Sequence, residues 1–107
     1  MTNIITKGIL GDAVIETLKN IYDPEIPVNI HEMGLIYEVK VDDDYNVYIL
    51  MTLTSPNCPV AESLPEEVKE RVKDINGIKD VKVEITFEPP WDKDMMSEAA
   101  QLELGLL

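Results

Sequence analysis

One cysteine gives this chain its clearest chemical signal, because of the proline that follows it. Cys58 is the only cysteine among 107 residues, and with Pro59 it stands where a strand-like segment gives way to a helix-like one. Proline is favoured at the first helical position, so Cys58 is predicted to be the N-cap. Unpaired N–H groups and the helix dipole favour a thiolate there, the form that attacks carbon or binds metal. The turn therefore predicts a functional thiol, with Thr54 and Ser55 as hydroxyl donors to a bound anion or sulfur.

The single thiol limits the metal site that the chain could form. Iron–sulfur clusters are typically held by about four thiolates, sometimes with histidine replacing some of them, and a stable zinc site needs about four ligands. One cysteine cannot meet that demand. A bound cluster would therefore be transient, and it would be shared with a second chain, completed by a partner or a small thiol, or held in part by oxygen. Sharing between two copies would favour a homodimer with Cys58 near the two-fold axis.

Two considerations weigh against a reactive thiol at this position. Free cysteines are among the most buried residue types and usually behave as small apolar side chains. The carboxylates of Glu62 and Glu66 follow Cys58 closely and would oppose its ionisation. A buried structural cysteine therefore stays open as an alternative.

Three further positions carry side chains that could take part in catalysis or binding. Asp23 and Glu25 stand in a loop stiffened by two prolines, where paired carboxylates could exchange protons or hold a metal, or could simply face solvent. His31 is the one histidine, and a lone loop histidine is predicted at the surface. Trp91 follows two prolines and is either a partner-binding anchor or a cover over the core. Sequence spacing indicates no Ser-His-Asp or Cys-His pair.

The elements that must position these residues follow from hydrophobic periodicity. A period near 3.6 marks helices, and a period of 2 marks half-buried strands. The pattern predicts a helix over about 12–21, strands over 35–41, 47–54 and 81–87, a helix from about 63 to 75, and a last helix beginning near residue 92. The order α-β-β-α-β-α is that of a two-layer α+β domain with a small, mixed three-stranded sheet.

The patterns also predict the positions of individual residues within these elements. Asp12 is predicted to cap the first helix, and Gly77 to take the left-handed conformation that ends the second. Tyr37 is predicted on the inner face of the first strand and Phe87 on that of the third. The last helix is predicted to turn four side chains inward, namely Met95, Met96, Ala99 and Leu102.

Length and charge exclude several classes of protein. Residues 1–107 are predicted to form a single domain, because a second core would have almost nothing to build from. The 21 acidic residues outnumber the 9 basic ones, and the net charge of −12 predicts no binding to nucleic acid or to anionic membranes. Such a charge favours encounters with basic protein surfaces. The chain lacks a signal-peptide pattern, a long apolar run and paired cysteines, so we expect a cytoplasmic protein.

Four segments taken together resemble the SufT/PaaD-like family, and most of all its bacterial SufT members. These segments are DPEIP at 23–27, MGLIY at 33–37, MTLTSPNCP at 51–59 and FEPPW at 87–91. They cover nearly the whole chain in the family's order and at single-domain length. Met33 stands where the family usually has leucine, a tolerable change in packing. The chain lacks the cysteine-rich tail of PaaD-type members, which favours SufT.

The resemblance implies a fold of the iron–sulfur-cluster-assembly type and a role in the maturation of iron–sulfur proteins. It also implies that Cys58 is the family's cysteine, that Asp23 and Glu25 form its acidic loop, and that Thr54 and Ser55 are its hydroxyl residues. The leading hypothesis is an accessory factor, not an enzyme, that assists the delivery or insertion of clusters into client apo-proteins. Cys58 would be a transient cluster ligand, and assembly scaffold or carrier proteins would be partners.

Two other functions stay open at this point. A non-catalytic adaptor would bind apo-enzymes or assembly partners, in a PaaD-like or targeting role, through its acidic surface and Trp91. Its binding would survive the loss of Cys58 and would weaken with salt. A thiol enzyme would use Cys58 as its nucleophile, but only His31 or a carboxylate is available as the general base.

Overall fold

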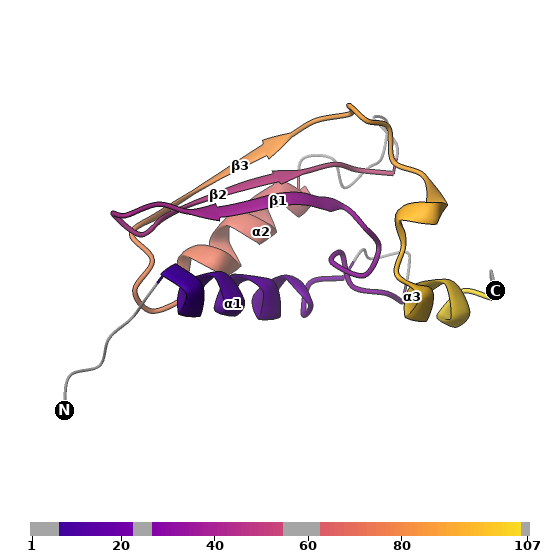
Figure 1. The fold of residues 1–107 in the computed structure, drawn as a ribbon, viewed down its shortest axis with the longest axis horizontal. Coiled ribbons are helices and arrows are strands. Elements are labelled where there is room, and N and C mark those ends of the chain that lie inside the picture. Colours follow the sequence, from indigo (N-terminus) through magenta and orange to yellow (C-terminus); the bar gives the residue numbers. More distant parts are fainter. Residues whose placement is uncertain (1–6, 23–26, 55–62, 106–107) are drawn as a thin grey trace.

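A three-stranded sheet with two helices packed beneath it forms the body of the molecule (Figure 1). This computed structural model describes residues 7–22, 27–54 and 63–105. The elements are α1 (Lys7–Leu18), β1 (Ile36–Val41), β2 (Asn46–Met51), α2 (Ser63–Lys73), β3 (Asp80–Ile85), the 3₁₀ turn η1 (Lys93–Met95) and α3 (Glu98–Glu103). This order confirms the predicted α+β fold class. Within the described ranges, none of the helices has the length and apolar character that crossing a bilayer requires.

The sheet is mixed, with β2 in its centre. β1 and β2 form an antiparallel pair, and β3 runs parallel to β2 on the other side. Parallel neighbours cannot be joined by a tight turn, so the chain crosses over through α2 between them. The connection that leaves the C-terminal end of β2 therefore leads to the N-terminal end of α2.

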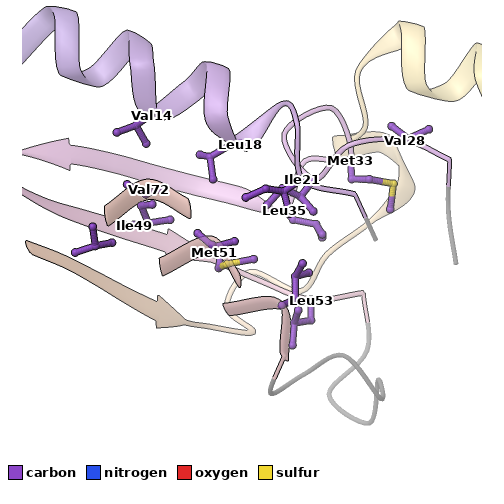
Figure 2. Packing of buried hydrophobic residues seen from close by; sticks show 14 of the residues in the cluster. Val14, Leu18, Ile21, Val28, Met33, Leu35, Ile49, Met51, Leu53 and Val72 are labelled. Atoms are coloured by element: carbon purple, nitrogen blue, oxygen red, sulfur yellow. The ribbon is translucent and has the colours of Figure 1, made fainter. Parts of the chain in front are cut away.

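The core lies between the sheet and the helices. Figure 2 shows Val14 and Leu18 of α1 pointing toward the sheet, in which β2 carries Ile49 and Met51. Each such side chain contributes about 1.5–3 kcal/mol when it is fully buried. The apolar residues on one face of β2 and on one stripe of α2 are buried: Val47, Ile49, Met51, Leu64, Val68 and Val72.

The first helix extends further toward the N-terminus than predicted. Asp12 is an exposed residue inside α1 and not its N-cap, so that prediction is wrong. Leu10 is buried, and it continues the apolar stripe one turn before Val14 and Leu18. The helix also ends three residues earlier than expected, although Ile21 is still fully buried.

A β-bulge reverses the predicted direction of Tyr37. The pairing register between β1 and β2 shifts between Ile36 and Glu38, so Tyr37 is the extra residue. Ile36 packs against the core, whereas Tyr37 does not. The Tyr37 hydroxyl instead donates a hydrogen bond to the carbonyl oxygen of Pro89, 2.7 Å away. Tyr37 and Pro89 are 52 positions apart in the sequence, so no local pattern could indicate this contact.

The region after β3 departs most from the predicted pattern. Phe87 is 40% exposed, because β3 ends at Ile85 and the chain then leaves the sheet. The predicted last helix is divided into η1 and α3, since the hydroxyl of Ser97 accepts a bond from the N–H of Ala100 and begins a new helix. Of the four side chains predicted inward, only Met96 is buried, and Met95, Ala99 and Leu102 are exposed. Ala100, which was not predicted inward, is buried.

Gly77 has the predicted positive φ, at +98°, but in a different setting. α2 ends at Lys73, and Gly77 lies in a following turn in which the N–H of Ile78 donates to the carbonyl of Ile75. The predicted left-handed backbone at Gly77 is therefore confirmed, and it belongs to a turn that follows the end of α2.

The loop between β1 and β2 provides a pH-dependent test of the hairpin. The Asp42 carboxylate accepts bonds from the backbone N–H groups of Asn46 and Asp44, both at 2.9 Å, and from the Asn46 side chain at 3.2 Å. These bonds, of which the one from the Asn46 backbone contributes most, lower the pKa of Asp42 below its ordinary value of 3.8. The stabilisation is therefore complete above that value and is lost as the pH falls through the lowered pKa.

We expect Asn46→Ala to raise the pKa of Asp42 part of the way back, because the side-chain bond is lost while the backbone bond remains. NMR titration of the Asp42 carboxyl carbon measures this change directly. Asn20→Ala is the control, since the Asn20 side chain donates to the Glu16 carbonyl and makes no bond to Asp42. An Asp42 pKa equal in wild type and Asn46→Ala would show that the side-chain bond contributes nothing.

Candidate functional site

The structure describes one of the five residues in the predicted thiol site. Thr54 is exposed and stands three residues after the end of β2. The other four, Asp23, Glu25, Ser55 and Cys58, lie outside the described residues. Their roles therefore stay predictions, and the structure contributes the framework on either side of them.

Buried residues hold both ends of the segment that contains the cysteine. Thr52 is fully buried and Leu53 is 4% exposed, so the chain is held in the core up to Thr54. On the other side, Leu64 in the first turn of α2 is 2% exposed. The segment that contains Cys58 therefore connects the end of the central strand β2 to the start of the crossover helix α2.

Backbone hydrogen bonds connect the chain before the acidic loop with the chain before the thiol turn. The N–H of Ile30 donates to the Ile21 carbonyl at 2.8 Å, and the N–H of Leu35 donates to the Ile30 carbonyl at 3.2 Å. The N–H of Thr52 then donates to the Leu35 carbonyl at 2.8 Å. Through these three bonds, the chain before the acidic loop and the chain before the thiol turn are held in one rigid framework, although they are far apart in the sequence.

Trp91 packs against the core at the same end of the sheet. Its side chain is half-buried, and its indole Nε1–H donates to the Met33 carbonyl oxygen at 2.8 Å. The bond joins the segment after β3 to the segment before β1. Of the two alternatives that the sequence left open, covering the core is therefore observed, and partner binding by Trp91 stays a prediction.

Replacing Trp91 with phenylalanine is expected to lower the free energy of unfolding by about 1 kcal/mol or more, because the Met33 carbonyl loses its donor. Urea denaturation measures the change. Tyr48→Phe is a matched control, since it removes a hydroxyl whose partner, Glu84, is at the surface. If both substitutions lower the free energy of unfolding by the same amount, the indole hydrogen bond stabilises the fold no more than a solvent-exposed hydrogen bond does.

His31 is less exposed than predicted. The side chain is half-buried, and its Nδ1 atom is enclosed with no hydrogen-bond partner in the part of the chain that the structure describes. It lies in a tight turn, where the N–H of Gly34 donates to its backbone carbonyl. Among residues 7–22, 27–54 and 63–105, no group of three or more His, Cys, Asp or Glu side chains could hold a metal ion.

Two hollows near this end of the sheet were not predicted from the sequence. One, of 570 Å³, lies beside Tyr37, Pro89 and Met95, and the β1 bulge contributes to it. The other, of 180 Å³, lies between Glu32 and Glu103, which α3 brings together. Each combines residues from distant parts of the chain, so no sequence signal marks them as neighbours.

The chain is similar in sequence to known proteins over most of its length. A family model described as "Iron-sulfur cluster assembly protein" matches residues 11–85. A Porphyromonas gingivalis protein named Fe-S protein maturation auxiliary factor is 53% identical over 94 residues, which are 88% of this chain and 90% of that protein. The Fe-S protein maturation auxiliary factor SufT of Staphylococcus aureus is 42% identical over 86 residues, 80% of this chain and 98% of that protein.

A solved structure supports the same relationship in three dimensions. The crystal structure of a domain of unknown function, DUF59, from Bacillus anthracis superposes with a TM-score of 0.87 at 31% sequence identity. The superposition covers 94% of this chain and 96% of that chain. The similarity therefore extends over the whole arrangement of helices and strands and is not limited to one motif.

Proposed function

Because the chain belongs to the iron–sulfur cluster assembly protein family, we propose that it is an accessory factor that helps deliver or insert iron–sulfur clusters into client apo-proteins. The resemblance to SufT proteins that the sequence indicated is confirmed. The observation that carries the proposal is the alignment, over most of their length, of relatives named Fe-S protein maturation auxiliary factors. Names of this kind support an auxiliary role and not a catalytic one.

Cys58 is the residue that we propose to contact the cluster. Its support is the predicted N-cap position before Pro59 and the buried framework on both sides of the turn. The cluster is cargo in this proposal. A single thiol binds it weakly, so the remaining ligands must come from a partner, a second copy or a small thiol. Transient holding suits a factor that must release the cluster to a client.

Asp23, Glu25, Thr54 and Ser55 complete the proposed working surface. Thr54 is exposed, as a residue in contact with a partner or a cluster must be. The partners in this proposal are iron–sulfur scaffold or carrier proteins and the client apo-proteins, and the location is the cytoplasm. The charge of −12 gives long-range attraction to partners with basic surfaces.

Deleting the gene and restoring it tests the proposed function. The deletion is expected to lower the activity of iron–sulfur enzymes such as aconitase, while enzymes without clusters keep theirs, and the wild-type gene should restore the lost activity. Immunoblots of aconitase separate a failure to load the cluster from a loss of the protein. Full aconitase activity in the deletion strain, under iron limitation as well as in rich medium, would refute the proposal.

A further inference from the structure

An open groove lies between the segment that follows α1 and the first turns of α3. Figure 1 shows these two parts of the chain side by side, beyond the end of the sheet. The groove has a volume of 180 Å³, and we call it the α3 groove. Its lining includes Tyr22, Pro27, Glu32, Ala99, Ala100 and Glu103.

One backbone hydrogen bond joins the two walls of the α3 groove, and two further contacts order the wall that follows α1. The N–H of Ser97 donates to the Glu32 carbonyl at 2.9 Å and joins the start of α3 to the opposite wall. The N–H of Glu32 donates to the side-chain oxygen of Asn29 at 2.8 Å, and Asn29 pairs with Tyr22 through a β-bridge. Ala100 is buried beneath the groove. The hollow is therefore part of the packed fold.

The lining of the groove combines apolar surface with acidic groups. Pro27 and Ala99 are exposed, and Tyr22 is 52% exposed. The charged residues of the lining are both acidic, Glu32 and Glu103. Neither carboxylate has an ion-pair partner among the described residues. An exposed apolar hollow with unpaired carboxylates matches a side chain that has an aliphatic stem and a cationic head.

We propose that the α3 groove binds a basic segment of a partner protein, with a lysine or arginine side chain lying in it. The aliphatic stem covers Ala99 and Pro27, and the cationic head pairs with Glu32 and Glu103. The exposed ring of Tyr22 adds a cation–π surface, which favours arginine. This inference rests on the proposed function in one respect only, namely that the partner is a client apo-protein or an assembly protein.

The test uses the full-length ¹⁵N-labelled chain and the synthetic peptide acetyl-Gly-Arg-Leu-Arg-Gly-amide. Addition of the peptide is expected to shift the amide signals of Val28, Glu32, Ala99 and Glu103 more than those of the acidic hairpin at 42–44. A peptide with citrulline in place of arginine keeps the shape and loses the charge, and its binding should be weaker. Higher salt should also weaken binding of the arginine peptide.

Two variants of the groove and one matched control make the test decisive. The double substitution Glu32→Lys and Glu103→Lys is expected to weaken binding by about tenfold. Ala99→Trp should block the groove without a change of charge, and the exposed position of Ala99 lets the ring remain outside the core. Glu98→Lys changes the charge of the same helix outside the lining, and its effect should be less than about twofold.

The outcomes separate this proposal from the proposed function. Equal weakening by Glu98→Lys and by the double substitution, or full binding by Ala99→Trp, would show general attraction to an acidic surface and would overturn the groove. In the deletion strain, groove variants that fold, bind no peptide and still restore aconitase fully would overturn the assignment of a client or assembly protein as the partner of the groove, while the accessory function stands. A deletion without any aconitase defect would refute the accessory function, and the peptide measurements would still decide whether the groove binds a cationic side chain.

Discussion

Cys58→Ala is expected to leave aconitase activity in the deletion strain at the level of the strain that carries no copy at all. The reason is chemical, since a methyl group can neither ligate iron nor form a mixed disulfide, and the chain has no second thiol to substitute for it. The measurement is aconitase activity per amount of aconitase protein, with the variant expressed at the wild-type level. Among single substitutions in this chain, this one should change function most.

Controls for the cysteine substitution separate ligation from folding. Cys58→Ser is close in size and supplies an N-capping oxygen in place of the sulfur at the predicted N-cap, so it should fold as the wild type does and still fail to restore activity. Thr54→Ala removes an exposed hydroxyl next to the turn and should have a smaller effect. Full restoration by both Cys58 variants would remove the thiol from the mechanism and favour the adaptor hypothesis.

Gly34→Ala is expected to lower the free energy of unfolding by about 2 kcal/mol or more. Gly34 has φ of +78°, a conformation that strains residues with a side chain. A Cβ atom at this position would also overlap the backbone carbonyl of Met95, which cannot move aside as a flexible side chain could. Strain and overlap act together where the segment before β1 meets η1. Urea denaturation of the purified variant measures the loss.

Two other glycines provide matched controls for this prediction. Gly105 has φ of +74° and open space where a Cβ atom would lie, so Gly105→Ala isolates the conformational strain, about 1 kcal/mol. Gly11 lies within α1 in open space, and Gly11→Ala should stabilise the chain by about 0.5–1 kcal/mol. If Gly34→Ala and Gly105→Ala had equal effects, contact with the Met95 backbone would contribute nothing.

Several parts of the fold could be predicted because their causes are local. Alternation along β2 and the apolar stripe of α2 are properties of neighbouring residues, and the core uses them as predicted. The same holds for the left-handed Gly77, which no other residue would fill without strain. The element order follows from these patterns, and it limits the chain to a small set of two-layer arrangements.

The candidate site could be predicted only in part. The sequence indicates which elements precede and follow the thiol turn, because proline and the change in periodicity mark the boundary between strand and helix. It does not indicate the hydrogen bonds from Ile21 through Ile30 and Leu35 to Thr52, since each joins segments whose approach depends on packing. The sequence also left open whether Trp91 covers the core or binds a partner, because its bond to Met33 likewise joins distant segments.

The amino-acid sequence by itself determined the class of fold, the faces that enter the core and the family resemblance built on four ordered segments. Only the tertiary structure decided that Tyr37 turns to Pro89 through a bulge, that Met95 and Leu102 are exposed, and that Glu32 meets Glu103 across a groove. The physical reason is the range of the interactions. Periodicity and backbone preference act between near neighbours, whereas these features arise from contacts that form after distant segments have packed together.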